Sequence, residues 1–370
     1  AGAKCPVQRL WISSLTEEAI REGFASLKPD SAYDGLYASA RCRSEADWII
    51  GMNASRAYTL RYDVLLSVGR VQTPTLALLV ARDREIRAFT PRDYWEIRAD
   101  FGDYTGLWID PETKEMRCYD HDRAEEIAAR VRGKEGVVTE NERARKTQPP
   151  PQLYDLTSLQ REANKLLGLS AAKTLEIAQA LYEKHKLLTY PRTDSRYITS
   201  DVALTLKDRL KAVNSGAYRD SASALIRAGQ IRTKYIVNDA KVTDHHAIIP
   251  TEEPADFMRM GGDEKKIYDL VVRRFLAVLS APYEYDETSL KLTVGKNEFF
   301  AKGNTVRTPG WKAAYGTFSA DDGEEDTDFE NRSQELPELK QGGTVKIREI
   351  KVEIAAPSTP MWKPKIRMAF

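Results

Sequence analysis

Apolar residues recur every three to four positions through roughly the first ninety residues of the chain. This period predicts helices, one beginning after a cap at Thr16 and another over residues 38–58. Thr73 and Pro74 suit the cap and the first turn of a third helix, because the first turn needs no N–H from the proline. The N-terminal part of the chain is therefore expected to be helical.

The period changes to two at about residue 93. Trp95 and Ile97 begin an alternation with polar neighbours, which is typical of a strand with one buried face. The same alternation returns after residue 283, for example at Leu290 and Leu292. Between the first strand and residue 150, the pattern predicts a helix over residues 122–132 and a strand over residues 136–146.

Helical spacing returns between these two alternating regions. Three prolines at 149–151 favour a stiff connector, so we place a domain boundary there. The helical signals that follow are a capping box at Thr157 and Gln160, a helix end at Gly168, a cap at Ser170 and a helix over 264–280. The first two helices fit either a helix-turn-helix unit or plain packing. The whole pattern predicts an α+β multidomain fold.

Composition sets limits on the class of protein. The 370 residues are 42% hydrophobic and 30% charged, and the net charge is 56 − 55 = +1, so the chain as a whole is not a basic nucleic-acid binder. The acidic run over 321–328 is most simply a solvated loop. No apolar run is long enough to span a bilayer, and the first residues lack the apolar core of a signal peptide. Three widely spaced cysteines fit a reducing compartment, so a cytoplasmic location is expected.

The segment Leu188-Thr-Tyr-Pro-Arg-Thr-Asp-Ser195 is the first candidate for chemistry. Pro191 keeps Tyr190 out of a helix, and in an extended chain Arg192 lies on the same side as Tyr190. A phenol needs help to act as a nucleophile, and a guanidinium can hold a phosphate by two parallel hydrogen bonds. Asp194 can orient Arg192 or contact a sugar. The plain alternative is a strand end followed by a polar turn with a surface ion pair.

Two further segments carry unusual side chains. His245 and His246 are adjacent, so on a strand they point in opposite directions and cannot easily bind one metal; a proton donor, a phosphate contact or an ordinary surface turn fits better. In Ser67-Val-Gly-Arg-Val-Gln-Thr-Pro74 a glycine precedes a helix start, which is a natural anion site. Residues 56–92 hold seven arginines, no lysine and three acids, 7 − 3 = +4, a local excess that suits a phosphate backbone but also a solvated helix.

Together these three segments resemble the type IA DNA topoisomerases, most closely topoisomerase III, in their order and spacing along the chain. Flanking stretches such as Ala46-Asp-Trp-Ile-Ile-Gly-Met-Asn53 agree as well, and the resemblance covers roughly residues 8–350. It implies a chain that cleaves and rejoins one DNA strand through a transient 5′-phosphotyrosine, with single-stranded DNA as the partner and with the chain acting as a monomer.

The resemblance also implies roles for individual residues. Tyr190 matches the nucleophile, Arg192 the arginine that positions the scissile phosphate, and His245 the histidine near the cleavage site, with Asp194 retained beside them. The residues matching the DNA-binding positions are Arg56, Arg70, Gln72, Thr73 and, in a supporting role, His246.

The architecture implied by the resemblance is an open ring. Residues 1–88 would form the first part of a helical DNA-groove domain, and residues 89–150 with 283–355 a β-rich arch. Residues 151–282 would form the helical domain that carries the nucleophile, which leaves 356–370 as an unassigned tail.

The resemblance has two departures. Members of the family begin with a Toprim domain whose acidic cluster holds Mg²⁺, whereas Gln8–Leu15 resembles the segment just after that domain. We therefore expect this chain to bind no metal itself, to depend on a trimmed, lost or separately encoded Toprim domain, and to relax DNA weakly or not at all alone. The tail over 356–370 also does not align with the family.

Two other functions fit some of the same residues. A non-catalytic single-stranded DNA-binding module would share the DNA path without the metal site. A relaxase or rolling-circle nickase also joins a tyrosine to a 5′-phosphate, but it uses two histidines separated by one residue, a spacing that His245 and His246 lack.

Overall fold

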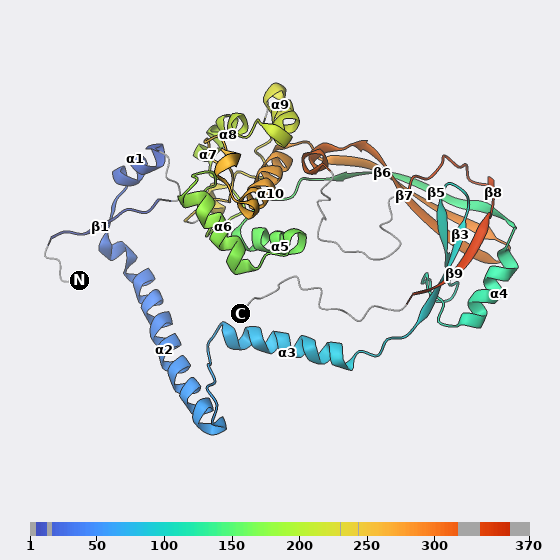
Figure 1. Ribbon diagram of the computed structural model, residues 1–370, viewed down its shortest axis with the longest axis horizontal. Coiled ribbons are helices and arrows are strands. Elements are labelled where there is room, and N and C mark those ends of the chain that lie inside the picture. Colours follow the sequence, from blue (N-terminus) through green and yellow to red (C-terminus); the bar gives the residue numbers. More distant parts are fainter. Residues whose placement is uncertain (1–4, 13–16, 230, 243, 317–333, 356–370) are drawn as a thin grey trace. The chain divides into compact units, whose positions relative to one another are not determined.

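The chain is described here by a computed structural model that covers residues 5–12, 17–229, 231–242, 244–316 and 334–355. It divides into two compact units, one formed by the described residues up to Thr90 and the other by those from Pro91 onward. Each unit is treated by itself (Figure 1). The acidic run over 321–328 and the tail over 356–370 lie outside the described residues.

The first unit contains three α-helices, two of them long, and a small β-ladder. Strands β1 and β2 pair antiparallel, with Gln8 opposite Pro29. The elements, in chain order, are β1 (Gln8–Arg9), α1 (Glu17–Ala25), β2 (Lys28–Pro29), the 3₁₀ helix η1 (Asp30–Tyr33), α2 (Asp34–Tyr62) and α3 (Gln72–Ala88).

Two helix boundaries in this unit differ from the sequence prediction. The helix predicted over 38–58 runs over Asp34–Tyr62, since its start is continuous with the preceding 3₁₀ turn. Thr73 is not the cap of α3, which begins at Gln72 after Val71. The Thr73 hydroxyl instead accepts a hydrogen bond from the backbone N–H of Gly69 at 3.0 Å, so it closes the turn before the helix.

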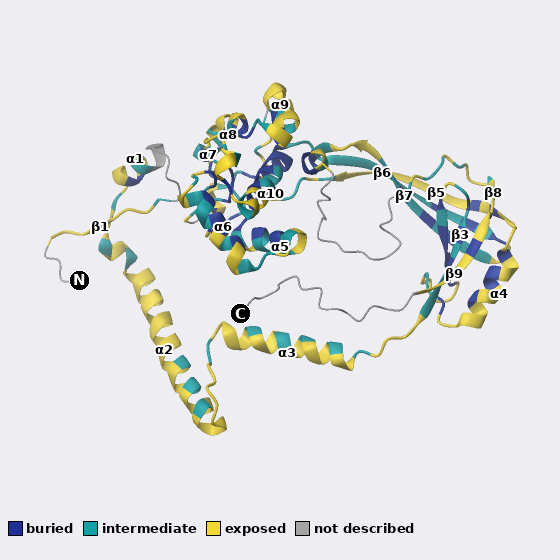
Figure 2. Cartoon of the chain, viewed as in Figure 1, coloured by how far each residue is buried: buried dark blue, intermediate teal, exposed yellow. Residues whose placement is uncertain are grey.

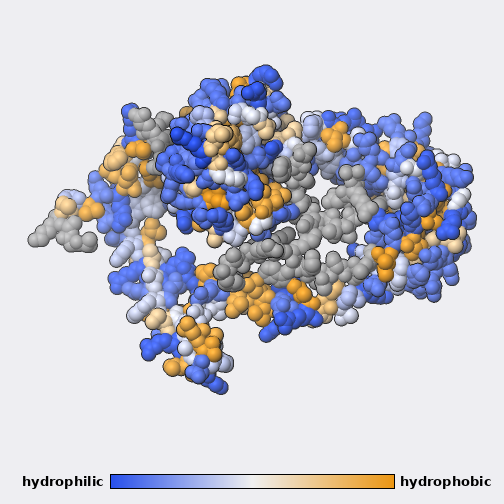
Figure 3. Space-filling model, in the orientation of Figure 1, coloured by the Kyte–Doolittle hydropathy of each residue, from blue (hydrophilic) through white to orange (hydrophobic). Residues whose placement is uncertain are grey.

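Helices α2 and α3 bury none of their residues among the described part of the chain. Large apolar side chains on α2 remain exposed, including Trp48 at 69% and Ile50 at 65%, and Leu78 on α3 is 73% exposed. Figure 2 shows these helices as almost wholly exposed or intermediate, and Figure 3 shows hydrophobic surface over both of them. The structure therefore assigns no apolar core to this pair of helices.

The second unit contains an antiparallel sheet of seven strands in the order β8-β5-β6-β7-β4-β3-β9. Strands from before residue 150 and after residue 282 thus pair in one sheet, which is curled in Figure 1. The strands are β3 (Tyr94–Asp100), β4 (Thr105–Ile109), β5 (Glu135–Gln148), β6 (Tyr283–Val294), β7 (Asn297–Thr308), β8 (Thr344–Lys346) and β9 (Glu349–Ala355). Helix α4 (His121–Val131) packs its apolar face, Ala124 to Val131, on this sheet.

The rest of the second unit is helical and has a separate hydrophobic core. Its centre is α10, which is buried on nearly all sides from Ile267 onward and contacts α5, α6, α9 and η5. The helices are α5 (Leu156–Leu167), α6 (Ala171–Glu183), α7 (Ser200–Leu204), α8 (Leu206–Ala212), α9 (Arg219–Ala228) and α10 (Gly262–Leu279). The 3₁₀ turns are η2 (Gly216–Tyr218), η3 (Asp239–Lys241), η4 (Phe257–Arg259) and η5 (Gly310–Tyr315).

The ends of α5 and α6 agree with the sequence prediction at two positions and differ from it at one. Gly168 ends α5 with a positive φ of 68°, and Ser170 caps α6, as predicted. The predicted box at Thr157 and Gln160 is wrong, because Asp155 is the N-cap and forms the box with Ser158. Asp155 was the better candidate, since its carboxylate is a stronger acceptor for the free N–H groups than a hydroxyl.

The long strands β5, β6 and β7 connect the sheet to the helical core, and one carboxylate joins all three. Asp286 of β6 lies 2.9 Å from the Arg143 guanidinium of β5 and 2.6 Å from the Arg307 guanidinium of β7. The Asp286 side chain is only 6% exposed. Hydrogen bonds from Arg307 and Arg143 outweigh its burial and hold the pKa of this carboxyl below its usual value.

We expect Asp286→Asn to lower the thermal stability of the chain at pH 7. Because the folded-state pKa of Asp286 lies below its unfolded value, its contribution is present above about pH 4 and is lost as the pH falls through the folded pKa. The difference in melting temperature between wild type and Asp286→Asn should therefore shrink as the pH is lowered from 7 to 3. Glu112→Gln, at an exposed position, is the control, and a difference that stays constant with pH would contradict the role of Asp286.

Candidate active site

The segment that carries Tyr190 lies beside the segment that carries the two histidines. Leu188 forms an isolated antiparallel bridge with Pro250, and the N–H of Thr189 donates to the carbonyl of Ile249 at 3.0 Å. The N–H of Thr251 donates to the carbonyl of Leu187, also at 3.0 Å. The structure thus brings together two motifs that are distant in the sequence.

Two threonine hydroxyls on either side of Tyr190 hold this pairing. Thr189 Oγ1 donates to the carbonyl of Ala247 at 3.1 Å and accepts from the N–H of Ile249 at 3.0 Å. Thr193 Oγ1 donates to the carbonyl of His245 at 2.8 Å and accepts from the N–H of Ser195 at 3.1 Å. Each hydroxyl therefore satisfies one acceptor and one donor, and the backbone at His245 is tied to the segment that follows Tyr190.

The Tyr190 ring contacts two other rings. The His245 ring has its centroid 4.3 Å from that of Tyr190, with an angle of 45° between the planes. Tyr182, in the last turn of α6, meets Tyr190 edge-on at 5.4 Å and 79°. Tyr190 is half-buried, so the residue packs against these rings and still keeps contact with solvent.

Arg192 and Asp194 lie on the exposed side of the same segment. Pro191, Thr193 and Ser195 are buried, whereas Arg192 and Asp194 are exposed, which is the alternation of an extended chain. Within the part of the chain that the structure describes, neither Arg192 nor Asp194 makes a hydrogen bond or an ion pair. The guanidinium of Arg192 is thus available to an anion, and Asp194 does not orient it through an ion pair.

His246 has a different environment from His245. It is half-buried, and its Nδ1 lies 2.8 Å from the carbonyl oxygen of Ala247. Burial lowers the pKa of the His246 imidazole, which favours its neutral form at pH 7. His246 makes no ring contact with Tyr190 among the described residues. The two adjacent histidines thus have different surroundings.

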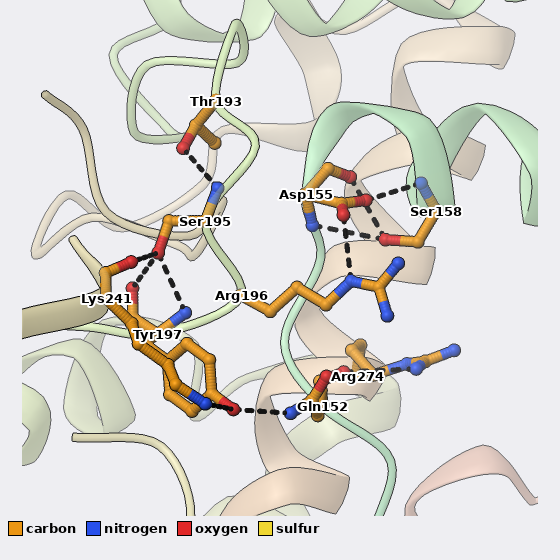
Figure 4. Close-up of polar contacts among 9 residues, drawn as sticks. All are labelled: Gln152, Asp155, Ser158, Thr193, Ser195, Arg196, Tyr197, Lys241 and Arg274. Atoms are coloured by element: carbon orange, nitrogen blue, oxygen red, sulfur yellow. Dashed lines mark hydrogen bonds and ion pairs between the residues drawn. The ribbon is translucent and has the colours of Figure 1, made fainter. Parts of the chain in front are cut away.

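Figure 4 shows the contacts that hold the chain just after the tyrosine. Arg196 Nε donates to Asp155 Oδ2 at 2.8 Å, and the other carboxylate oxygen of Asp155 accepts from the N–H of Ser158. Burial raises the pKa of Asp155, but the hydrogen bonds from Ser158 and Arg196 outweigh it and lower the pKa overall. The Tyr197 hydroxyl accepts from Gln152 Nε2 at 3.0 Å and from Lys241 Nζ at 3.3 Å.

The remaining predicted DNA-binding residues belong to the first unit. Arg70, Gln72 and Thr73 surround the turn before α3 and are exposed, and Arg70 Nε lies 2.6 Å from an oxygen of Asp47 on α2. Arg56 is exposed on α2 and has no ion-pair partner among the described residues. The hydroxyls of Ser55 and Thr59 accept N–H bonds from Val68 and Leu66, so α2 holds the loop that leads to this turn.

Several residues that shape the site were not predicted from the sequence. Tyr182 carries no local signal, since an aromatic residue near a helix end is ordinarily core. Thr189 and Thr193 flank Tyr190 with a spacing of four, which was the signal available for them. Buried Arg209 donates to the carbonyl of Pro250 at 2.6 Å and pairs with Glu252 at 2.7 Å, and only the fold places it under the histidine segment.

Comparisons with known proteins identify relatives of this chain. The family profile described as DNA topoisomerase matches residues 31–362. DNA topoisomerase 3 from Bacillus subtilis (strain 168) is 47% identical over 350 residues, covering 95% of this chain and 48% of that protein. DNA topoisomerase 3 from Bacillus licheniformis is 45% identical over 345 residues, covering 93% of this chain and 47% of the relative.

The structure of full-length topoisomerase I from Thermotoga maritima superposes with a TM-score of 0.70 at 28% identity, covering 95% of this chain and 55% of that one. The chain therefore belongs to the type IA DNA topoisomerases, as the three motifs predicted. Within that family it is similar to the proteins named DNA topoisomerase 3, and it spans about half the length of the curated relatives it matches.

Three further findings concern metals, membranes and thiols. Among the described residues, no group of three or more His, Cys, Asp or Glu side chains is placed to hold a metal ion. In that same part of the chain, none of the helices has the length and apolar character that crossing a membrane requires. Cys5, Cys42 and Cys118 are free thiols.

We expect Thr193→Val to lower the free energy of unfolding by about 1–3 kcal/mol, because it leaves the His245 carbonyl and the Ser195 N–H without a buried partner. Urea unfolding measures the loss, and NMR chemical shifts of the Tyr190 and His245 rings should move with it. Thr199→Val is the matched control, since the buried Thr199 hydroxyl has no hydrogen-bond partner among the described residues. Equal stability of the two variants would contradict a stabilising hydrogen bond between Thr193 and His245.

Proposed function

We propose that this chain is the strand-cleaving core of a topoisomerase III-like enzyme that cuts and rejoins one strand of DNA. The observation that carries the proposal is the Tyr190 ring held against His245 at 4.3 Å, with the unpaired Arg192 on the exposed side of the same segment. Membership of the type IA DNA topoisomerases supports this proposed function. The activity of the whole enzyme remains a proposal, because the chain spans about half the length of its relatives.

In the proposed reaction the Tyr190 oxygen attacks a phosphorus of single-stranded DNA. An oxygen–phosphorus bond forms, the bond from phosphorus to the 3′-oxygen breaks, the phenol gives up its proton and the 3′-oxygen gains one. The 5′-phosphoryl end stays on the protein as a phosphotyrosine, and attack by the 3′-hydroxyl reverses the step and rejoins the strand.

Each residue of the site has a proposed part in this step. Arg192 would hold the scissile phosphate and stabilise the charge that grows on it. His245 would contact the DNA or the departing 3′-oxygen next to Tyr190, and neutral His246 would support it. Asp194 would contact the DNA strand. In the first unit, Arg56, Arg70, Gln72 and Thr73 would grip the single strand that leads to the site.

Each part of the chain has a proposed role in handling DNA. Residues 1–88 would line the DNA groove, residues 89–150 and 283–355 would form the arch, and residues 151–282 would carry Tyr190. Support comes from the division of the chain after Thr90 and from the single sheet that both arch segments build. Mg²⁺ would be held by a Toprim domain outside the described residues. We also propose a monomer that acts on DNA in the cytoplasm.

Incubation with a single-stranded oligonucleotide, followed by denaturation, should trap a covalent adduct that depends on Tyr190. A 3′-end label should move with the protein and a 5′-end label should remain on a shortened free fragment, because the 5′-phosphoryl side is the one that is joined. Tyr190→Phe should abolish the adduct and keep single-stranded DNA affinity within about twofold, since only the attacking oxygen is removed.

The trap is run with and without a separately supplied Toprim domain and Mg²⁺. Tyr182→Phe is the matched control, because it removes a phenol oxygen from the ring that contacts Tyr190 and should leave the adduct. DNA binding without an adduct under both conditions would favour a non-catalytic binding module. Robust Mg²⁺-dependent relaxation by the isolated chain would contradict the proposed need for the added domain, and tight Mn²⁺ binding lost on changing either histidine would favour a relaxase.

A further inference from the structure

Lys186 adopts a backbone conformation that suits glycine. Its φ is 59°, in the left-handed region, at the point where the chain leaves α6 for the Tyr190 segment. The turn is fixed by a bond from the N–H of Leu187 to the carbonyl of Leu181 at 2.9 Å. A bond from Thr251 Oγ1 to the Lys186 carbonyl at 2.6 Å ties the same residue to the histidine segment. Glycine would occupy this position without the steric conflict of a Cβ, so the turn itself does not explain a lysine.

The side chain of Lys186 is directed toward the rings of the site. Its ammonium lies 5.8 Å from the centroid of the Tyr182 ring, which in turn meets the Tyr190 ring edge-on at 5.4 Å. Lys186 is exposed and has no carboxylate partner among the described residues. The ammonium thus lies near a ring that packs against Tyr190, and no ion pair neutralises its charge in the described part of the chain.

Lys114 shows that a lysine can adopt the left-handed backbone conformation without an aromatic ring beside its side chain. It has nearly the same φ, 61°, and is exposed in the part of the chain that forms the sheet. Its backbone N–H donates to the carbonyl of Asp110 at 2.9 Å, and its side chain makes no ring contact among the described residues. Lys114 thus provides a comparison in which the backbone strain is the same and the aromatic cluster is absent.

We infer that Lys186 binds a backbone phosphate of single-stranded DNA next to the one held by Arg192. An ammonium on a flexible stem is a good partner for a phosphate that must enter and leave. Lys186 precedes Tyr190 in the sequence and Arg192 follows it, so an unpaired cation lies on each side of the tyrosine along the chain. The inference rests on the proposed function and adds a second phosphate contact to that site.

The test is single-stranded oligonucleotide binding by the full chain, measured by fluorescence anisotropy over a range of salt concentrations. Lys186→Gly should be as stable as the wild type or more stable, because the left-handed backbone is relieved, and should still lose affinity. The expected loss is about fivefold at 0.1 M salt, with the slope of log affinity against log salt less steep by about 0.7, the effect of one phosphate contact on a single strand. Lys186→Arg should keep both affinity and slope.

Lys114→Gly is the matched control, which should change stability in the same sense and leave DNA binding unchanged. If Lys186→Gly binds with wild-type affinity and salt slope, Lys186 is only a helix cap and the inference is wrong. A wild-type chain that fails to bind single-stranded DNA would instead contradict the proposed function, and with it this inference. Lys186→Asn, which tolerates the same φ without the charge, should behave like Lys186→Gly and excludes an effect of backbone freedom.

Discussion

The site depends on the pairing of the Tyr190 segment with the histidine segment. Thr193 and His245 are joined by a hydrogen bond across 52 residues of sequence, and Thr189 makes the corresponding bonds to Ala247 and Ile249. These hydroxyls are largely removed from water, so each bond that is lost would leave an unsatisfied polar group. The contact between the Tyr190 and His245 rings follows from this pairing, because each of the two paired segments carries one of the rings.

Charge is divided between groups that hold the fold and groups that remain free. Asp155 with Arg196, Glu252 with Arg209, and Asp286 with its arginines are partly or fully buried pairs that position backbone segments. Removing one partner of such a pair leaves an uncompensated charge, which is far more costly than losing a surface ion pair. Arg192 and Lys186 have no such partner among the described residues, so their charge is available to a ligand.

The two units differ in how they gain stability. The second unit has two apolar cores, one under the sheet and α4 and one around α10. In the first unit the described residues of α2 and α3 form no such core, and hydrogen bonds from Ser55 and Thr59 are among the contacts that connect α2 to the following loop. Helices normally draw most of their stability from packing an apolar face. Among the described residues, the helices of the second unit have this source of stability and α2 and α3 do not.

The local pattern of the sequence predicted the longer helices and the alternating strands, although not the short helices α7, α8 and α9, and three motifs were enough to predict the family. Both depend on nearest neighbours along the chain: a period of two or of 3.6, a capping residue, or a short run of side chains. The cap at Asp155 and the start of α3 were missed because several polar residues competed for each boundary. The partners of Tyr190, the three strands joined by Asp286 and the left-handed lysine were decided only by tertiary structure. They depend on which distant segments pack together, and no local period contains that information.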